Sequence, residues 1–208
     1  MKRGKWIACL LLVWLSAGNA STPLDSSAAD SSSQAVASQT NASKLPEDVS
    51  AYASLPIANG QICVAGVKTD DDGMNQKPVV YLAQPHGGFA WNVSLPLPTN
   101  TYQARATHCI AAQQVLLVLV QGDTQSEQSL SQTLLQVVEL DRRTGKVIAT
   151  KGVSVPNVTS AYTEWVEKDA DNFSLASKKL VIKGQYALLS NRDQPSAFTV
   201  QMSQDLNP

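Results

Sequence analysis

Two histidines are the side chains of this sequence best suited to acid–base or metal chemistry, and they stand apart in the chain. His86 lies in the turn-forming run Pro-His-Gly-Gly, and His108 directly precedes a cysteine. Neither belongs to an HxH or HExxH pattern, which would bring two imidazoles to one metal ion. We therefore predict no metal site and assign no catalytic role to either histidine.

A cluster of acids follows further along, in the run TEWVEKDADN at residues 163–172, which contains Glu164 and Glu167. Two carboxyl groups held across a cleft can hydrolyse glycosidic bonds. Alternating acids in a polar connection more commonly form a solvated surface. Trp165 stands between them; tryptophan often anchors binding sites, and it can equally close the edge of a core.

The run DDDG at residues 70–73 has the oxygen atoms that Ca²⁺ prefers, without the spacing of a calcium loop. With Gly73 in sixth place, the first and twelfth ligands of an EF-type loop would be Lys68 and Val79. Neither residue binds calcium through its side chain. The run is interpreted as a polar hairpin loop with Gly73 at its tip.

No catalytic motif occurs elsewhere: the sequence lacks GxSxG, Ser-x-x-Lys, a phosphate-binding loop and GxGxxG. It also predicts no cofactor. What remains are loop acids and aromatic residues that could contact a partner. The candidate binding residues are Asp70, Asp72, Trp91 and Trp165.

The first twenty residues have the layout of a secretory signal peptide. A basic start, MKRGK, precedes the apolar run WIACLLLVWL at residues 6–15, and small residues lead to a cleavage site after Ala20. The apolar run is too short to span a membrane, which takes about twenty residues. Cys9 lies inside it, where a lipid-anchored cysteine is not found. We predict an exported protein, periplasmic or secreted, without a transmembrane segment after signal removal.

The remaining chain is mildly acidic. Three of the 16 Lys and Arg residues lie in the signal segment, so 13 remain against 17 acids, a net charge of −4. Nucleic acid and anionic membranes both attract clusters of basic residues, and the chain has none. Neither partner is expected.

Two cysteines remain after signal removal, and their contexts match: Ile-Cys63-Val-Ala beside His-Cys109-Ile-Ala. In an oxidising compartment an even pair predicts a disulfide. Two buried free thiols are the alternative.

Residues 21–50 are rich in Ser, Ala and Gln and contain almost no branched apolar side chains. Such a segment buries too little surface to offset its ordering entropy, so a disordered tether is predicted. The folded domain is then 51–208.

Short runs rich in β-branched residues, separated by turn residues, predict an all-β domain of antiparallel hairpins. The best helical candidate is 160–173, expected as a short helix or a loop. Turns are predicted at 70–73, 85–88, 144–145 and 191–195. Strands are predicted at 62–68, 78–84, 89–95, 115–121, 134–141, 146–155, 180–184, 186–190 and 197–202.

Two stretches of this domain look duplicated. VVYLAQPHGGFAWNVSLPLP at 79–98 aligns without a gap with VVELDRRTGKVIATKGVSVP at 137–156, and the two cysteines are interpreted as matched positions of the same repeat. The stretch 186–200 is interpreted as a third, eroded copy, giving units of about 60–108, 109–158 and 175–205.

The second copy resembles the strand-turn-strand signature of quinoprotein-type β-propeller blades, an apolar-x-Leu-Asp-x-x-Thr-Gly run often followed by Trp. Asp141, Thr144 and Gly145 fit it, and the first copy supplies Gly87 and Trp91 at matching positions. The resemblance implies blade-like antiparallel units in which Gly145 adopts a positive φ and Asp141 bonds the turn amides. It carries over no quinone cofactor.

A propeller typically needs four to eight blades, and this chain is too short for a complete one. The expected fold is all-β, with blade-like or sandwich-like hairpin repeats. An oligomer in which several chains close a ring is kept as an alternative. The expected function is a non-enzymatic protein-binding or scaffolding protein of the cell envelope, such as an inhibitor or protective partner of an envelope enzyme. The alternatives are a small secreted hydrolase using a carboxylate and a histidine, and a structural component that self-associates.

Overall fold

The computed structural model describes residues 44–73, 75–124 and 131–206. These residues belong to one compact unit, Ser38–Pro208; the other unit, Met1–Ala37, lies outside them. The predicted signal peptide and the tether as far as residue 43 therefore also lie outside. The first strand begins at Val49, close to the predicted start of the folded domain.

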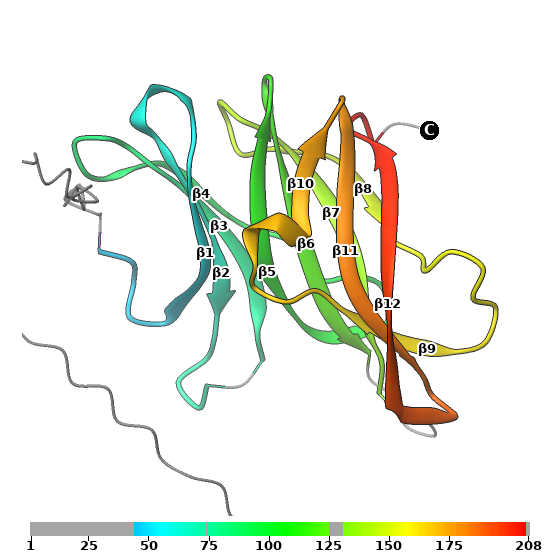
Figure 1. Ribbon diagram of the computed structural model, residues 1–208. Coiled ribbons are helices and arrows are strands. Elements are labelled where there is room, and N and C mark those ends of the chain that lie inside the picture. The colour runs from blue at the N-terminus through cyan, green and yellow to red at the C-terminus, as the bar shows by residue number, and fades with distance from the viewer. Residues whose placement is uncertain (1–43, 74, 125–130, 207–208) are drawn as a thin grey trace, which may run out of the picture. The chain divides into compact units, whose positions relative to one another are not determined.

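Three antiparallel four-stranded sheets follow one another along the chain (Figure 1). In sheets A and B each strand pairs with the next. In sheet C, β11 pairs with β12 on one side and with both β9 and β10 on the other. Sheet A contains β1 (Val49–Pro56), β2 (Ile62–Lys68), β3 (Lys77–Ala83) and β4 (Phe89–Ser94); sheet B contains β5 (Thr101–Ala112), β6 (Val115–Thr124), β7 (Thr133–Asp141) and β8 (Val147–Gly152); sheet C contains β9 (Tyr162–Trp165), β10 (Phe173–Ala176), β11 (Lys179–Leu188) and β12 (Asn191–Ser203).

The all-β prediction is confirmed. Within the described residues, both helical segments, η1 (Ala58–Gly60) and η2 (Ala170–Asn172), are 3-10 turns of three residues. The segment 160–173, expected as a short helix or a loop, contains the strand β9, which was not expected, and a 3-10 helix of three residues, η2. β9 takes its backbone hydrogen bonds from β11, and local periodicity cannot reveal a partner that distant. None of the helices in the described part of the chain is long and apolar enough to cross a membrane.

Sheet B lies between sheets A and C, and β6 is buried on both of its faces. Leu116, Val118 and Val120 belong to the core shared with sheet A, while Leu117 and Leu119 belong to the core shared with sheet C. A strand covered on both faces needs apolar side chains at every position instead of alternate ones. This explains the unbroken apolar run of β6.

The aligned stretches 79–98 and 137–156 occupy equivalent places, since each holds the last two strands of its sheet, β3–β4 and β7–β8. The cysteines, however, are not equivalent, and their interpretation as matched positions is wrong. Cys63 lies in β2, the second strand of sheet A, whereas Cys109 lies in β5, the first strand of sheet B. The counterpart of β2 is β6.

The strands missed by the sequence pattern are the first strands of the sheets: β1, β5, and both β9 and β10. β1 and β5 contain irregularities in their pairing, between Ala51 and Ala53 and between Ala106 and His108. A bulge shifts the alternation of side chains and so hides the period of two. The predicted units therefore start later than the sheets, whose first strands begin at Val49, Thr101 and Tyr162.

The turn predicted at 191–195 is also wrong. The hairpin between β11 and β12 turns at residues 189–190, and 191–195 already belong to β12. Pro195 can stand there because β12 is the terminal strand of its sheet, where one strand edge needs no partner.

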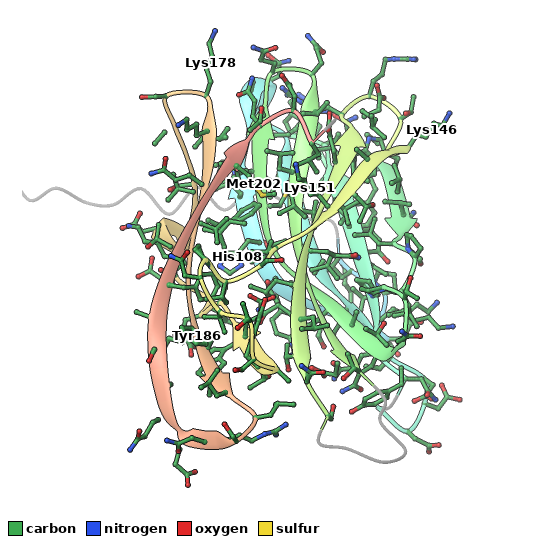
Figure 2. The ribbon with its side chains drawn as sticks, turned by 90° about the vertical axis from the view of Figure 1, so that its right-hand side faces the viewer. His108, Lys146, Lys151, Lys178, Tyr186 and Met202 are labelled. Atoms are coloured by element: carbon green, nitrogen blue, oxygen red, sulfur yellow. A yellow bond between two sulfur atoms is a disulfide. The ribbon has the colours of Figure 1, made fainter. Side chains whose placement is uncertain are left out.

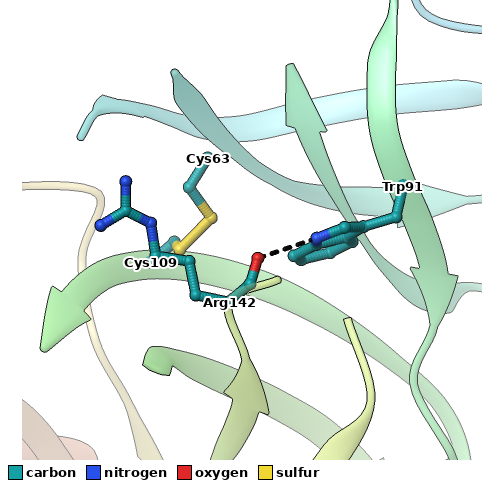
Figure 3. The surroundings of a disulfide bond; sticks show 4 residues. All are labelled: Cys63, Trp91, Cys109 and Arg142. Atoms are coloured by element: carbon teal, nitrogen blue, oxygen red, sulfur yellow. Dashed lines mark hydrogen bonds between the residues drawn. A yellow bond between two sulfur atoms is a disulfide. The ribbon is translucent and has the colours of Figure 1, made fainter. Parts of the chain in front are cut away.

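A disulfide joins sheets A and B, as predicted. Cys63 and Cys109 are bonded, with their Cα atoms 6.4 Å apart (Figure 3). Both cysteines belong to the apolar core between the two sheets. The bridge therefore ties β2 to β5 across the layer boundary.

Trp91 and Arg142 form a second connection between the same sheets (Figure 3). The indole N–H of Trp91, on β4, donates to the backbone carbonyl of Arg142 at 3.0 Å. The Arg142 guanidinium reaches back to sheet A and donates to the carbonyl of Ala58 at 2.9 Å and to the amide oxygen of Gln61 at 3.1 Å. Each sheet thus supplies a donor to the other.

The turn between β7 and β8 has the geometry that its sequence predicts. Gly145 has a φ of 73°, and the Asp141 carboxylate accepts from the Thr144 amide at 2.7 Å and from its hydroxyl at 2.6 Å. These bonds from Thr144 lower the pKa of Asp141 below its ordinary value. The aromatic ring of Trp91 lies against Gly145, where an added Cβ would be 2.7 Å from Trp91 Cε3.

We expect the disulfide to contribute about 4 kcal/mol to the free energy of unfolding, because it closes a long loop in the unfolded chain. Replacing both Cys63 and Cys109 by Ala should lower the midpoint of urea denaturation accordingly. Intact-mass measurement should show two more alkyl groups when reduction precedes alkylation than when it does not. Equal alkylation in both samples would contradict the bridge.

Gly145→Ala should destabilise the protein more than Gly73→Ala, by about 1–3 kcal/mol for the overpacked contact with Trp91. The two glycines have nearly the same φ, 73° and 72°, so the backbone cost cancels in the comparison. A Cβ at Gly73 would meet nothing within 4 Å. Urea denaturation measures both variants, and the difference should shrink in a Trp91→Ala background. Equal losses for both glycines would show that the contact adds nothing.

Candidate functional site

The predicted binding residues do not come together in one place. Asp70 and Asp72 lie in the loop between β2 and β3, Trp91 lies in the interface of sheets A and B, and Trp165 lies on β9. The indole N–H of Trp91 is engaged by Arg142. Trp165 is the one that borders a groove together with residues of all three sheets.

The loop with Asp70 borders a separate hollow of about 390 Å³. Lys68, one of the two lysines that border this hollow, forms an ion pair with Asp48 at 2.9 Å. Asn75 donates to the Asp70 carboxylate, and the Gly73 amide donates to the Asp70 carbonyl at 2.9 Å. The loop therefore has the hairpin character that was predicted, with Gly73 in the left-handed region.

The groove at Trp165 runs along β5, which is the terminal strand of sheet B. It consists of an outer hollow of about 460 Å³ and an inner hollow of about 270 Å³, and both are bordered by Tyr52 of β1 and by Lys168. We call this the β5 groove. Its outer part is lined by Arg105, Thr107, Gln121, Thr133, Trp165, Val166 and Glu167, and its inner part by Ala53, Ser54, Leu55, His108, Cys109, Ile110, Ala170, Phe173 and Ser174.

Lys168 and Tyr52 meet across the β5 groove. The ammonium nitrogen of Lys168 lies 4.8 Å from the centroid of the Tyr52 ring, a distance at which a cation is attracted to the ring face. Tyr52 belongs to sheet A, and Lys168 follows the β9 strand of sheet C. Their contact connects the two walls where the outer and inner hollows adjoin.

Arg105 provides a second cation at the β5 groove, and Asp123 compensates its charge. The guanidinium donates to the Asp123 carboxylate at 2.9 Å, and Gln103 and Thr133 donate to the same carboxylate at 2.8 and 2.7 Å. Burial opposes ionisation of Asp123, but the bonds from Thr133 and Gln103 and the charge of Arg105 outweigh it. The net effect lowers the pKa of Asp123.

Side chains, not a backbone ladder, hold β9 against sheet B. Gln121 donates to the Val166 carbonyl at 3.0 Å and accepts from the Val166 amide at 3.3 Å. The Thr133 amide donates to the Thr163 hydroxyl at 2.9 Å, and the Leu135 amide donates to the Glu164 carboxyl at 3.1 Å. The wall that carries Trp165 is therefore positioned by a few polar contacts.

Glu164 is fully buried, with an exposed fraction of 0%. Its Oε1 accepts from Leu135, and its Oε2 has no hydrogen-bond partner among the described residues. Burial raises the pKa of Glu164 to about 7, and the Leu135 amide opposes this rise. An uncompensated buried carboxylate is costly, so the neutral acid is favoured in the folded protein at mildly acidic pH.

His108 lines the inner part of the β5 groove and is 4% exposed. Its Nδ1 lies 3.0 Å from the Thr107 hydroxyl, and its Nε2 lies 3.3 Å from the Asp169 carbonyl. Burial lowers the pKa of His108, which favours the neutral imidazole. In Figure 2, His108 lies in the interior, whereas Lys146 and Lys178 project outward from hairpin turns. His86 is exposed in the β3–β4 turn.

The acidic cluster of 163–172 splits into two environments. Glu164 is buried, whereas Glu167, Asp169 and Asp171 are exposed. Glu167 accepts from the Trp165 indole N–H at 3.0 Å, and Asp169 caps η2 by accepting from the Asp171 amide at 2.9 Å. The exposed acids form the solvated surface that alternating acids commonly make, and burial separates Glu164 from them.

Among the described residues, no three His, Cys, Asp or Glu side chains are grouped so that they could hold a metal ion. Comparison with protein-family models and with curated proteins finds no match to this chain.

The sequence reasoning did not anticipate the roles of Tyr52, Arg105, Gln121 and Lys168. Gln121 had a usable signal, because it follows a run of five buried apolar residues in β6 and a polar residue in such a strand needs partners. Tyr52 and Lys168 had none, since their contact joins two sheets that are far apart in the chain.

Glu164→Gln should change how the free energy of unfolding depends on pH. Because folding raises the pKa of Glu164 from 4.5 to about 7, the folded state binds the proton more tightly, and stability falls as pH rises through this window. Relative to the Gln variant, the wild type should lose on the order of 3 kcal/mol between pH 4.5 and 7. Urea denaturation at several pH values measures this loss.

The comparison cancels the opposite contribution of His108, which is present in both proteins. Glu167→Gln is the matched control, because Glu167 lies three residues away and is exposed. It should leave the pH profile of the wild type unchanged. Parallel profiles for the wild type and Glu164→Gln would contradict a raised pKa at Glu164.

Proposed function

We propose that the protein is an exported, non-enzymatic binding or scaffolding protein of the cell envelope, and that its partner is another protein. An inhibitor or protective partner of an envelope enzyme would be one form of this function. The observation that carries the proposal is the β5 groove, which residues of all three sheets border. Export is supported by the signal-like start of the sequence and by the disulfide.

The shape of the β5 groove favours an extended segment of the partner. It is bordered by the terminal strands of the sheets: β1 in sheet A, β5 in sheet B, and β9 and β10 in sheet C. Terminal strands offer backbone groups to an incoming strand, and extended peptides commonly bind in this way. The groove also extends over two hollows, which share Tyr52 and Lys168 on their borders.

The lining indicates the side chains that this segment carries. Lys168 is an exposed cation in the middle of the groove, in a chain that is otherwise acidic, and an acidic side chain would complement it. The inner hollow presents Leu55, Ile110 and Phe173 and would take an apolar side chain. Trp165 provides an aromatic surface in the outer hollow, of the kind that dominates binding energies.

Capture from an envelope extract on the immobilised protein tests the proposal. A partner retained by the wild type should be retained at least about tenfold less by Trp165→Ala, since truncating a binding tryptophan commonly costs more than 1.4 kcal/mol. Lys168→Glu should have the same effect through charge reversal, and its side chain is exposed, so the fold should tolerate it.

Ile148→Ala is the matched control, because Ile148 is an apolar residue of β8 that is 48% exposed and does not border the groove. It should retain the partner as the wild type does. The same partner should be cross-linked by a photoreactive residue at position 168 and not by one at position 148. Equal capture by all four proteins, or capture of nothing by the wild type, would count against the proposal.

A further inference from the structure

Glu164 belongs to β9, the short strand that carries Trp165 of the β5 groove. β9 has only four residues and pairs through its backbone with β11 alone. On the side of sheet B, it is held by the carboxyl of Glu164 and by the side chains of Thr163 and Gln132, together with the bonds from Gln121 to the next residue. β9 can therefore move away from sheet B without breaking a ladder of backbone bonds between the two.

The surroundings of Glu164 offer no compensation for a negative charge. In register with it on β11 stands Tyr186, and Tyr162 lies two residues earlier on β9; neither side chain supplies a positive charge. Asp123 of β6 is linked to β9 through Thr133, and its partner Arg105 is already engaged by it. Oε2 of Glu164 has no partner among the described residues. Loss of the proton therefore places an uncompensated charge in the interface of β9 and β7.

We propose that the Glu164 carboxyl acts as a proton-dependent latch on the β5 groove. While it is protonated, β9 stays docked on sheet B and the groove is complete. When it loses its proton, β9 moves away from sheet B so that the carboxylate reaches water, and Trp165 and the following segment to Lys168 move with it. The regulatory part of this inference rests on the proposed binding function, whereas the movement of β9 does not.

Hydrogen exchange of the free protein tests the movement. The amides of 162–168 should exchange faster in the wild type than in Glu164→Gln, and the ratio of the two rates should rise roughly 20-fold from pH 5.5 to 7.5, as follows from a pKa of 4.5 in the open state and about 7 in the docked state. Taking the ratio at each pH removes the chemical dependence of exchange on pH. Glu167→Gln should behave as the wild type does.

The amides of β6 are the internal control, because this strand is buried on both faces and exchanges through global unfolding. Because global unfolding also frees Glu164, their ratio should rise by a similar factor, but at each pH they should exchange far more slowly than the amides of 162–168. A constant ratio at 162–168 would overturn the latch, since Glu164 would then not control β9. Equal protection of 162–168 and of β6 would also overturn it, because β9 would then leave sheet B only when the whole domain unfolds.

Capture of the partner at pH 5.5 and 7.5 tests the regulation. The wild type should retain at least about tenfold less partner at pH 7.5, and Glu164→Gln should retain similar amounts at both pH values. Retention that is independent of pH, with β9 opening as expected, would overturn the regulatory part alone. If no partner is captured by any variant while the exchange ratio rises, the proposed function fails and the movement of β9 stands.

Discussion

The burial of sheet B on both faces is the constraint on which the other parts of the described structure depend. Leu116 to Val120 of β6 are all fully buried, three of them in the core shared with sheet A and two in the core shared with sheet C, in alternation. Exposing such side chains to water costs roughly 1.5–3 kcal/mol each. Neither outer sheet can separate from sheet B without exposing several of them. The three sheets are therefore expected to fold together, and the polar sites can form only at their edges.

The two boundaries of sheet B are built differently. Toward sheet A there are a disulfide, the Trp91–Arg142 bond and an apolar core. Toward sheet C there is a second apolar core, but at its edge β9 is held by separate polar bonds from Thr133 and Leu135, and the following Val166 by two bonds with Gln121. The β5 groove lies along that edge. One wall of the groove is therefore joined covalently to the central sheet, and the other is held by contacts that a single proton can weaken.

Much of the fold could be predicted because its signals are local. The turn at Gly145, the strand runs around Val79 and Val137, and the pairing of Cys63 with Cys109 follow from residue types and spacing. The first strand of each sheet could not be predicted, since bulges in β1 and β5 interrupt the alternation and β9 depends on a distant partner. Of the candidate site, Trp165 was found because tryptophan is conspicuous. The burial of Glu164, in a run that looks solvated, arises from tertiary packing alone.

The contact between Trp91 and Gly145 gives the duplicated hairpins an order along the chain. Trp91 comes from one copy and Gly145 from the other, so each copy contributes half of a joint. In the second copy Ala149 aligns with Trp91, and the same joint cannot be repeated toward sheet C. The two copies are thus no longer interchangeable: loss of the second would leave Trp91 without its glycine, and loss of the first would leave Gly145 without its tryptophan.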